Sequence, residues 1–239
     1  MMENISHSPR RASKFARLFR NLRSSQSGLA MIEFAYSMPI LMGLGMYGTE
    51  TAFLATANMK LSQTALNLAD NASRLGQADN NVATPTIRES GINQVFSGAK
   101  TQGQSIDLMN HGRAILTSLE VTSGGQQFIR WRRCKGVKNS ATHYNDDLNG
   151  DNVVDTTFTG MGPTGAKVQA STNSAVMFVE VEYNYQPLFG NMFHPTTTVL
   201  RQEASFNIRD NRNLSAGLYN DLTPTTKAAT CNKYDTVTS

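Results

Sequence analysis

An uncharged apolar stretch near the amino terminus constrains this chain more than any other feature. Residues 34–49 contain no Asp, Glu, Lys or Arg, and Glu33 and Glu50 stand at either side of them. With its apolar neighbours the stretch extends over 29–57, beyond the roughly 20 residues that a helix needs to cross the ~30 Å hydrocarbon core of a bilayer. The sequence therefore predicts a transmembrane helix over 29–57.

Basic residues before this stretch set its expected orientation. The first 28 residues carry a net charge of +5, whereas the rest of the chain carries −1. Because basic flanks stay on the cytoplasmic side, we expect 1–28 to be a basic cytoplasmic leader and the carboxyl-terminal part to lie outside the inner membrane. The basic residues are Arg10, Arg11, Lys14, Arg17, Arg20 and Arg23, opposed by Glu3 alone.

The overall charge of +4 does not indicate a nucleic-acid-binding protein. Such a protein needs a basic face on its folded part. Downstream of the leader only IRWRRCKGVK, residues 129–138, gathers positive charge, and so short a cluster is more typical of a solvated strand or loop. We expect no nucleic-acid partner.

The helix is predicted to continue past the membrane as an amphipathic segment over 58–76. Apolar residues recur there at spacings of 4, 3, 4 and 3, which is the pattern of one helix face. Gly76 is a suitable end for a helix about 70 Å long, and Pro39 is expected to kink it. The apolar face consists of Leu61, Ala65, Leu68, Ala72 and Leu75.

The residues around Glu33 resemble a known processing site. A basic leader is followed by Gly28, a short apolar step, Glu-Phe-Ala at 33–35, and Pro39. This arrangement resembles the amino-terminal module of the TadE/TadG-like family, pilin-like components of the bacterial tight-adherence (Tad) pilus assembly system. The resemblance covers residues 20–75.

The resemblance implies that a prepilin peptidase cleaves between Gly28 and Leu29. It also implies that Glu33 pairs with the free amino group of a neighbouring subunit, since an unpaired carboxylate in lipid is costly. The implied partners are other pilin-like subunits and pilus assembly proteins, reached through the helix in the inner membrane or in the pilus.

Two simpler interpretations of the amino-terminal region stay open. The first is an uncut membrane anchor. The second is a secretory signal peptide removed after Ala57, because Ala55-Thr56-Ala57 has the small-x-small pattern of a cleavage site. The charge of Glu33, the long leader and Pro39 fit a signal peptide poorly.

Downstream of residue 76 the chain predicts an exported α+β domain of pilin-like shape, over 77–212. A helix is expected from Pro85 to Gly98, with Thr86 and Glu89 as a capping box. Alternating apolar and polar residues predict strands at 114–121, 127–133, 174–185 and 200–208.

These strands are expected to form an antiparallel sheet with one polar face. The long amino-terminal helix would pack on the other face. Residues 213–239 are expected to form a loosely ordered tail that Cys231 holds in place. The two cysteines, Cys134 and Cys231, can form a disulfide in an exported domain. Such a bond closes a loop of about 98 residues and stabilises by about 4–5 kcal/mol; the alternative is two unrelated buried thiols.

The sequence DDLNGDNVVD matches part of a calcium-binding loop. It resembles the D-x-N-x-D loop of dockerin and EF-hand-like modules, although Phe158 replaces the glutamate usual at position 12. The alternative is an acidic surface loop. The expected Ca²⁺ ligands are Asp147, Asn149, Asp151, the carbonyl of Val153, and Asp155.

Nothing in the sequence indicates an enzyme. Two G-x-G-x-x-G matches, in 43–48 and 160–165, lack the strand-to-helix context of a nucleotide-binding loop. The histidines are scattered, without metal-ligand spacing. We therefore expect a TadE/TadG-like pseudopilin in pilus assembly; the alternative is a secreted or membrane-anchored binding module, calcium-stabilised and unrelated to pili.

Overall fold

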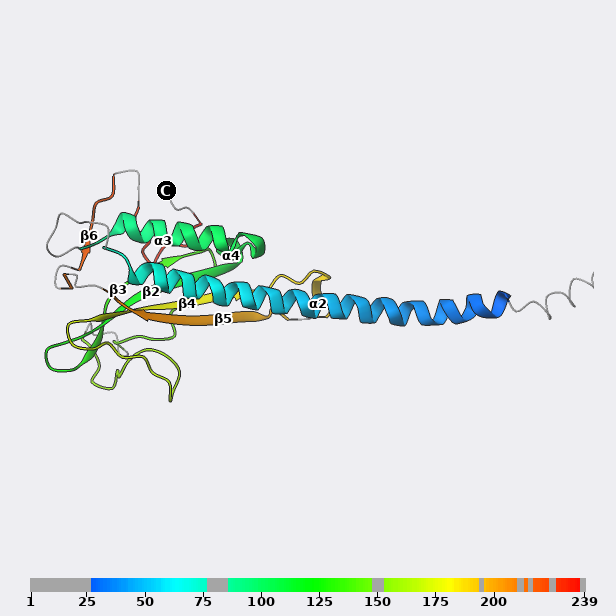
Figure 1. Cartoon of the computed structure of the whole chain (residues 1–239), viewed down its shortest axis with the longest axis horizontal. Helices are drawn as coiled ribbons and strands as arrows, with labels where there is room; N and C mark the ends of the chain where they lie inside the picture. Colours follow the sequence, from blue (N-terminus) through cyan, green and yellow to red (C-terminus); the bar gives the residue numbers. More distant parts are fainter. Residues whose placement is uncertain are drawn as a thin grey trace, which may run out of the picture. The chain divides into compact units, whose positions relative to one another are not determined.

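The computed structural model describes residues 27–76, 86–147, 153–193, 196–209, 213–214, 217–223 and 227–236. The chain divides into two compact units that meet between Thr49 and Glu50, and each is described by itself. One helix, α2, runs through this boundary from Ser27 to Ser73 (Figure 1). The leader predicted over 1–28 lies outside the described residues except for its last two.

The second unit, which we call the domain, contains a four-stranded antiparallel sheet in the order β3-β2-β4-β5. Its α+β class agrees with the class predicted from the sequence. The elements after α2 are β1 (Ile87–Arg88), α3 (Glu89–Gln102), η1 (Gln104–Ile106), α4 (Leu108–His111), β2 (Gly112–Val121), β3 (Gln127–Lys135), β4 (Ala175–Asn184), η2 (Gly190–Met192), β5 (Val199–Asn207) and β6 (Leu218–Tyr219).

The strands follow the predicted alternation closely. The β2–β3 hairpin closes over residues 122–126, between the first two predicted strands. Gly125 there has φ +85° and donates its N–H to the carbonyl of Thr122. A positive φ at this position favours glycine. In β4, the side chains of Met177, Val179 and Val181 are buried together on one face.

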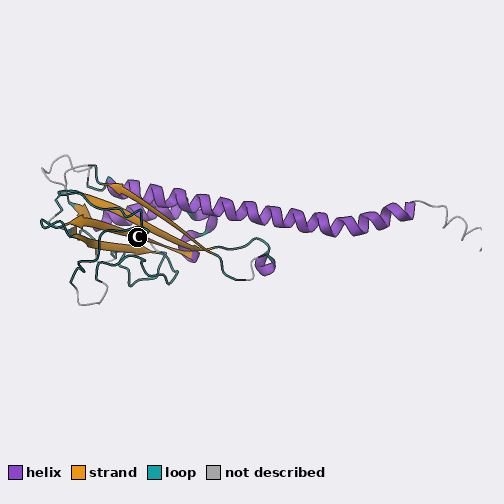
Figure 2. Ribbon diagram, turned by 90° about the horizontal axis from the view of Figure 1, so that it is seen from below, coloured by secondary structure: helices purple, strands orange, loops and turns teal. Residues whose placement is uncertain are grey.

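Two helices cover this face of the sheet (Figures 1 and 2). The predicted apolar face of α2 lies in the main core: Leu61, Ala65, Leu68 and Ala72 are each at most 1% exposed, and Leu75 is half-buried against them. Ile92 and Phe96 of α3 enter the same core. The apolar face that the 3.6-residue periodicity of α2 predicts therefore packs against other parts of the same chain.

The start of α3 differs from the prediction. Thr86 does not cap the helix, because Ile87 and Arg88 are extended and pair with β6. Asp221 takes the capping role from far along the chain, accepting hydrogen bonds from the N–H and hydroxyl of Ser90 at 3.0 and 2.5 Å. Strand pairing therefore overrides the local capping box.

The other face of the sheet is also different from the prediction, because it is not open to water. The long β3–β4 connection folds back over it in its described parts, 136–147 and 153–174. Phe158 and Met161 of this connection pack against Leu119 and Phe178 in a second apolar cluster. The polar residues that alternate along β2 and β4 are therefore buried as well.

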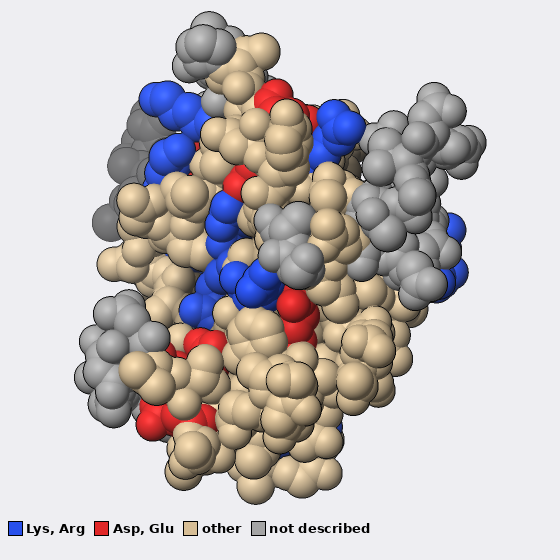
Figure 3. Space-filling model, turned by 90° about the vertical axis from the view of Figure 1, so that its left-hand side faces the viewer, with Lys and Arg blue, Asp and Glu red and all other residues tan. Residues whose placement is uncertain are grey.

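Described parts of the carboxyl-terminal segment contact the domain. The predicted disulfide between Cys134 and Cys231 is present and joins residues 97 apart in sequence. The buried guanidinium of Arg113 donates to the carbonyls of Cys231 and Lys233 at 2.5 and 3.2 Å. Figure 3 shows basic and acidic side chains next to each other at one end of the domain, without a broad basic face in that view.

Candidate functional segment of the long helix

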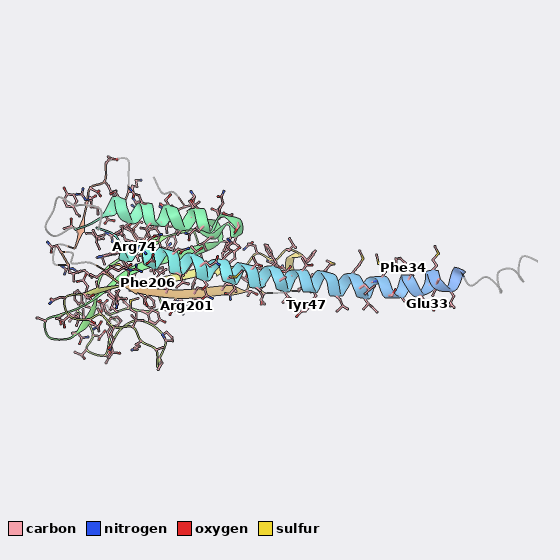
Figure 4. All side chains as sticks on the ribbon, in the orientation of Figure 1. Glu33, Phe34, Tyr47, Arg74, Arg201 and Phe206 are labelled. Atoms are coloured by element: carbon pink, nitrogen blue, oxygen red, sulfur yellow. A yellow bond between two sulfur atoms is a disulfide. The ribbon has the colours of Figure 1, made fainter. Side chains whose placement is uncertain are left out.

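The first unit consists, in its described part, of α2 from Ser27 to Thr49. Every residue from Gly28 to Thr49 is exposed except Met46, which is half-buried. Large apolar side chains such as Phe34 (61% exposed) and Tyr47 (58%) point away from the helix (Figure 4). We call Gly28–Thr49 the uncovered segment.

The uncovered segment belongs to a helix that is long and apolar enough to cross a membrane, the one such helix in the described part of the chain. Its 22 residues span about 33 Å at 1.5 Å per residue, which matches the hydrocarbon core. Soluble proteins rarely expose apolar surface this continuous. The segment is therefore a candidate for contact with lipid or with other helices.

Glu33 is the single charged residue within the uncovered segment. Its side chain is exposed, and within the described ranges it has neither a hydrogen bond nor an ion pair. Leu29 precedes it by four residues, so the two lie on the same side of the helix one turn apart. An amino group created at Leu29 would thus lie within one turn of a carboxylate.

Gly28 and Pro39, the other residues predicted here, are both inside α2. A Cβ atom added at Gly28 would meet no other atom within 4 Å, so the glycine is not required by packing. The helix continues on both sides of Pro39. The kink predicted at Pro39 stays a prediction.

Glu50, the first residue of the domain, has an opposite environment. Its side chain is 1% exposed, and its carboxylate accepts three hydrogen bonds. The donors are the hydroxyl of Tyr185 at 2.7 Å and the backbone N–H groups of Leu188 and Phe189 at 3.0 and 3.1 Å. Burial raises the pKa of the Tyr185 hydroxyl, and the hydrogen bond to the Glu50 carboxylate raises it further. We call this arrangement the Glu50 site.

The sequence places Glu50 at the end of the uncharged stretch but does not indicate the partners of its carboxylate. The available signal was the rule that a buried carboxylate needs donors, together with the uncharged YQPLFGNMF between the last two long strands. Neither identifies the pairing, because more than 130 residues separate Glu50 from Tyr185. The membrane span predicted over 29–57 stays untested, but its last eight residues belong to the domain.

Only part of the predicted calcium loop can be described. Asn149 and Asp151 lie outside the described residues, so the ligand set of Asp147, Val153 and Asp155 is incomplete. The N–H of Asp155 donates to the carbonyl of Asp146 at 2.7 Å. Within the described ranges, no group of three or more His, Cys, Asp or Glu residues could hold a metal ion. The calcium site stays a prediction.

Buried carboxylates on β4 form a polar cluster that the sequence did not predict. Glu180 is 1% exposed and accepts from the Thr142 hydroxyl at 2.6 Å and the His143 N–H at 2.9 Å. The His143 ring lies between two carboxylates, with Nδ1 3.3 Å from Glu180 and Nε2 3.3 Å from Glu182. These contacts hold Thr142 and His143 of the β3–β4 connection against β4.

Glu182 is held by the same connection. Burial opposes its charge, but hydrogen bonds from Ser140 and Lys138 and the charges of Lys138 and His143 outweigh this and lower the pKa of Glu182. The Lys138 Nζ lies 3.0 Å from the carboxylate. These contacts hold Lys138 and Ser140 of the β3–β4 connection against β4 and so stabilise the fold.

Comparison of the chain with protein-family models, with curated proteins and with solved structures returns no match.

Proposed function

We propose that this chain is a single-pass, pilin-like membrane protein of the TadE/TadG type that takes part in assembling a bacterial Tad-type adhesion pilus. One observation carries the proposal: a single helix combines an apolar surface that nothing in the described chain covers with one exposed carboxylate, Glu33, five residues after Gly28. A buried core helix would have neither feature.

The proposed arrangement places each part of the chain in a compartment suited to its chemistry. The basic leader stays in the cytoplasm, the uncovered segment crosses the inner membrane, and the domain lies outside. A disulfide between Cys134 and Cys231 fits an oxidising compartment such as the periplasm.

Glu33 would act after cleavage at Gly28. The new amino group at Leu29 and the Glu33 carboxylate are both costly to leave unpaired in lipid. When helices of several subunits pack together, the amino group of one subunit can pair with the carboxylate of the next, so that assembly neutralises both charges. The pairing would favour packed subunits over isolated ones.

The structure of the domain argues against the alternative of a protein secreted by cleavage after Ala57. Ala57 is 1% exposed in the main core, and such cleavage would also remove Glu50. Tyr185 and two backbone N–H groups would then lose their acceptor. A binding module released at Asn58 would therefore lack part of its own fold.

The deciding experiment is to determine the first residue of the mature protein purified from its native host. Leu29 supports the proposal. Asn58 would support secretion, and Met1 would indicate an uncut anchor; either result contradicts processing of the pilin type.

A pair of matched variants tests the same bond. Gly28→Ala should block removal of the leader, whereas Gly45→Ala in the same helix should not. An added Cβ meets no atom within 4 Å at either position, so a difference between the variants cannot come from packing within the chain. Glu33→Val should leave the domain folded but impair assembly; normal pili from both Gly28→Ala and Glu33→Val would contradict the proposal.

A further inference from the structure

The connection between β4 and β5 presents an uncharged, apolar tip. Residues 185–193, YQPLFGNMF, contain no charged side chain, and we call them the apolar loop. Leu188 is 55% exposed, and Met192, at 69%, is the most exposed large apolar side chain described in the domain. Figure 2 shows η2 at the tip of this loop, beyond the ends of the strands.

The tip has a defined shape. The Phe189 and Phe193 rings pack edge to face with centroids 6.2 Å apart, and both are half-buried. Gly190 between them has φ +61°, a conformation that favours glycine. The aromatic pair supports a turn from which Leu188 and Met192 project.

The Glu50 site fixes where this loop is held. Its carboxylate binds the N–H groups of Leu188 and Phe189 directly, so the base of the tip is attached to the first residue of α2 after the uncovered segment. That segment has the length of one membrane crossing. The apolar loop is thereby attached at the residue where the helix would leave the hydrocarbon core.

We propose that the apolar loop inserts Leu188 and Met192 into the lipid interface on the outer side of the membrane, as a second contact of the domain with the bilayer. The inference rests on the proposed membrane crossing of α2. Apolar and aromatic side chains without charge are the chemistry that the interfacial region of a bilayer accepts. The partner is thus the lipid surface itself. The hydrogen bonds of the Glu50 site would hold the apolar loop close to that surface.

Depth-dependent fluorescence quenching of the full-length protein in vesicles tests the proposal. Trp131 is the only native tryptophan and is 8% exposed within the domain, so the unmodified protein supplies the background signal. Met192→Trp should be quenched by lipids brominated close to the headgroup, more than by lipids brominated near the chain end. Its emission should also shift to shorter wavelength on reconstitution.

Two further variants make the outcomes distinguishable. Tyr36→Trp, in the middle of the uncovered segment, should be quenched most by deeply brominated lipids. Leu66→Trp, an exposed position of α2 about 25 Å beyond Thr49, should not be quenched. If Tyr36→Trp is quenched and Met192→Trp matches Leu66→Trp, the loop faces water or a protein and the inference is overturned while the membrane crossing stands. If Tyr36→Trp is not quenched, both fail.

Discussion

The two stretches of α2 on either side of the Thr49–Glu50 boundary are similar in length and opposite in environment. Before the boundary, large apolar side chains are exposed, as Leu41 is at 63%. After it, Leu61 and Leu68 are at most 1% exposed in the core. The sequence distinguishes them, since the first stretch is apolar on all sides and the second on one face only.

The carboxylates of the two stretches repeat this contrast. Glu33 is exposed without a partner among the described residues, whereas Glu50 is buried and accepts three hydrogen bonds. Contacts within the described chain bury the apolar face and the carboxylate of the second stretch, whereas the side chains of the first stretch, except that of Met46, stay exposed. The domain begins at Glu50, and this difference is the observation on which the proposed function rests.

The largest effect should come from truncating a core leucine. Leu61→Ala removes a fully buried side chain and leaves a cavity, so it should lower the free energy of unfolding of the domain by about 2–5 kcal/mol. Denaturant titration in detergent solution, followed by the fluorescence of Trp131, measures this directly.

The matched control is Leu41→Ala in the uncovered segment. It should change the same free energy by less than about 0.5 kcal/mol, because the Leu41 side chain is 63% exposed and substitutions at exposed positions rarely change stability by more. A loss equal to that of Leu61→Ala would show that the two stretches are not energetically distinct.

The second largest effect should come from removing the Glu50 carboxylate, compared with removing that of Glu33. Glu50→Ala removes the carboxylate to which the Tyr185 hydroxyl and two backbone N–H groups donate, and should cost about 2–3 kcal/mol. Tyr185→Phe removes only one donor and should cost about 1 kcal/mol. Glu33→Ala should leave the unfolding transition unchanged; a shift there would mean that Glu33 contacts the domain.

Local patterns predicted most of the regular structure. The spacing of Leu61, Ala65 and Leu68 predicted a packed helix face, and alternation predicted the four long strands, because each pattern is contained within one element. The same locality makes Gly28 and Glu33 recognisable as a motif, although their function stays a proposal.

Contacts between distant parts of the chain could not be predicted in this way. The capping box at Thr86 failed because β1 pairs with β6, and Asp221 replaced it from 131 residues away. The polar side chains of β4 are buried because the described parts of the connection 136–174 cover them. The sequence of this connection has no regular periodicity from which its position could be predicted. Glu50 finds its donors only once β4 and β5 are paired, because their connection supplies all three.

The smallest expected effect is a dependence of the domain's stability on pH. Because the pKa of Glu182 is lower in the folded protein than its ordinary value of 4.5, the unfolded chain binds a proton before the folded one does. The stabilisation from Glu182 is therefore complete above about pH 4.5 and is lost as the pH falls through the lower, folded value.

Glu182→Gln should flatten the loss of stability on acidification, measured as the unfolding free energy between pH 6 and pH 3. Glu120 supplies a control of opposite sign: its burial raises its pKa against the charge of Arg130 and a Ser118 hydrogen bond, so the folded protein binds its proton first. Glu120→Gln should therefore steepen the same loss. A slope that stays unchanged in either variant would contradict the effect assigned to that carboxylate.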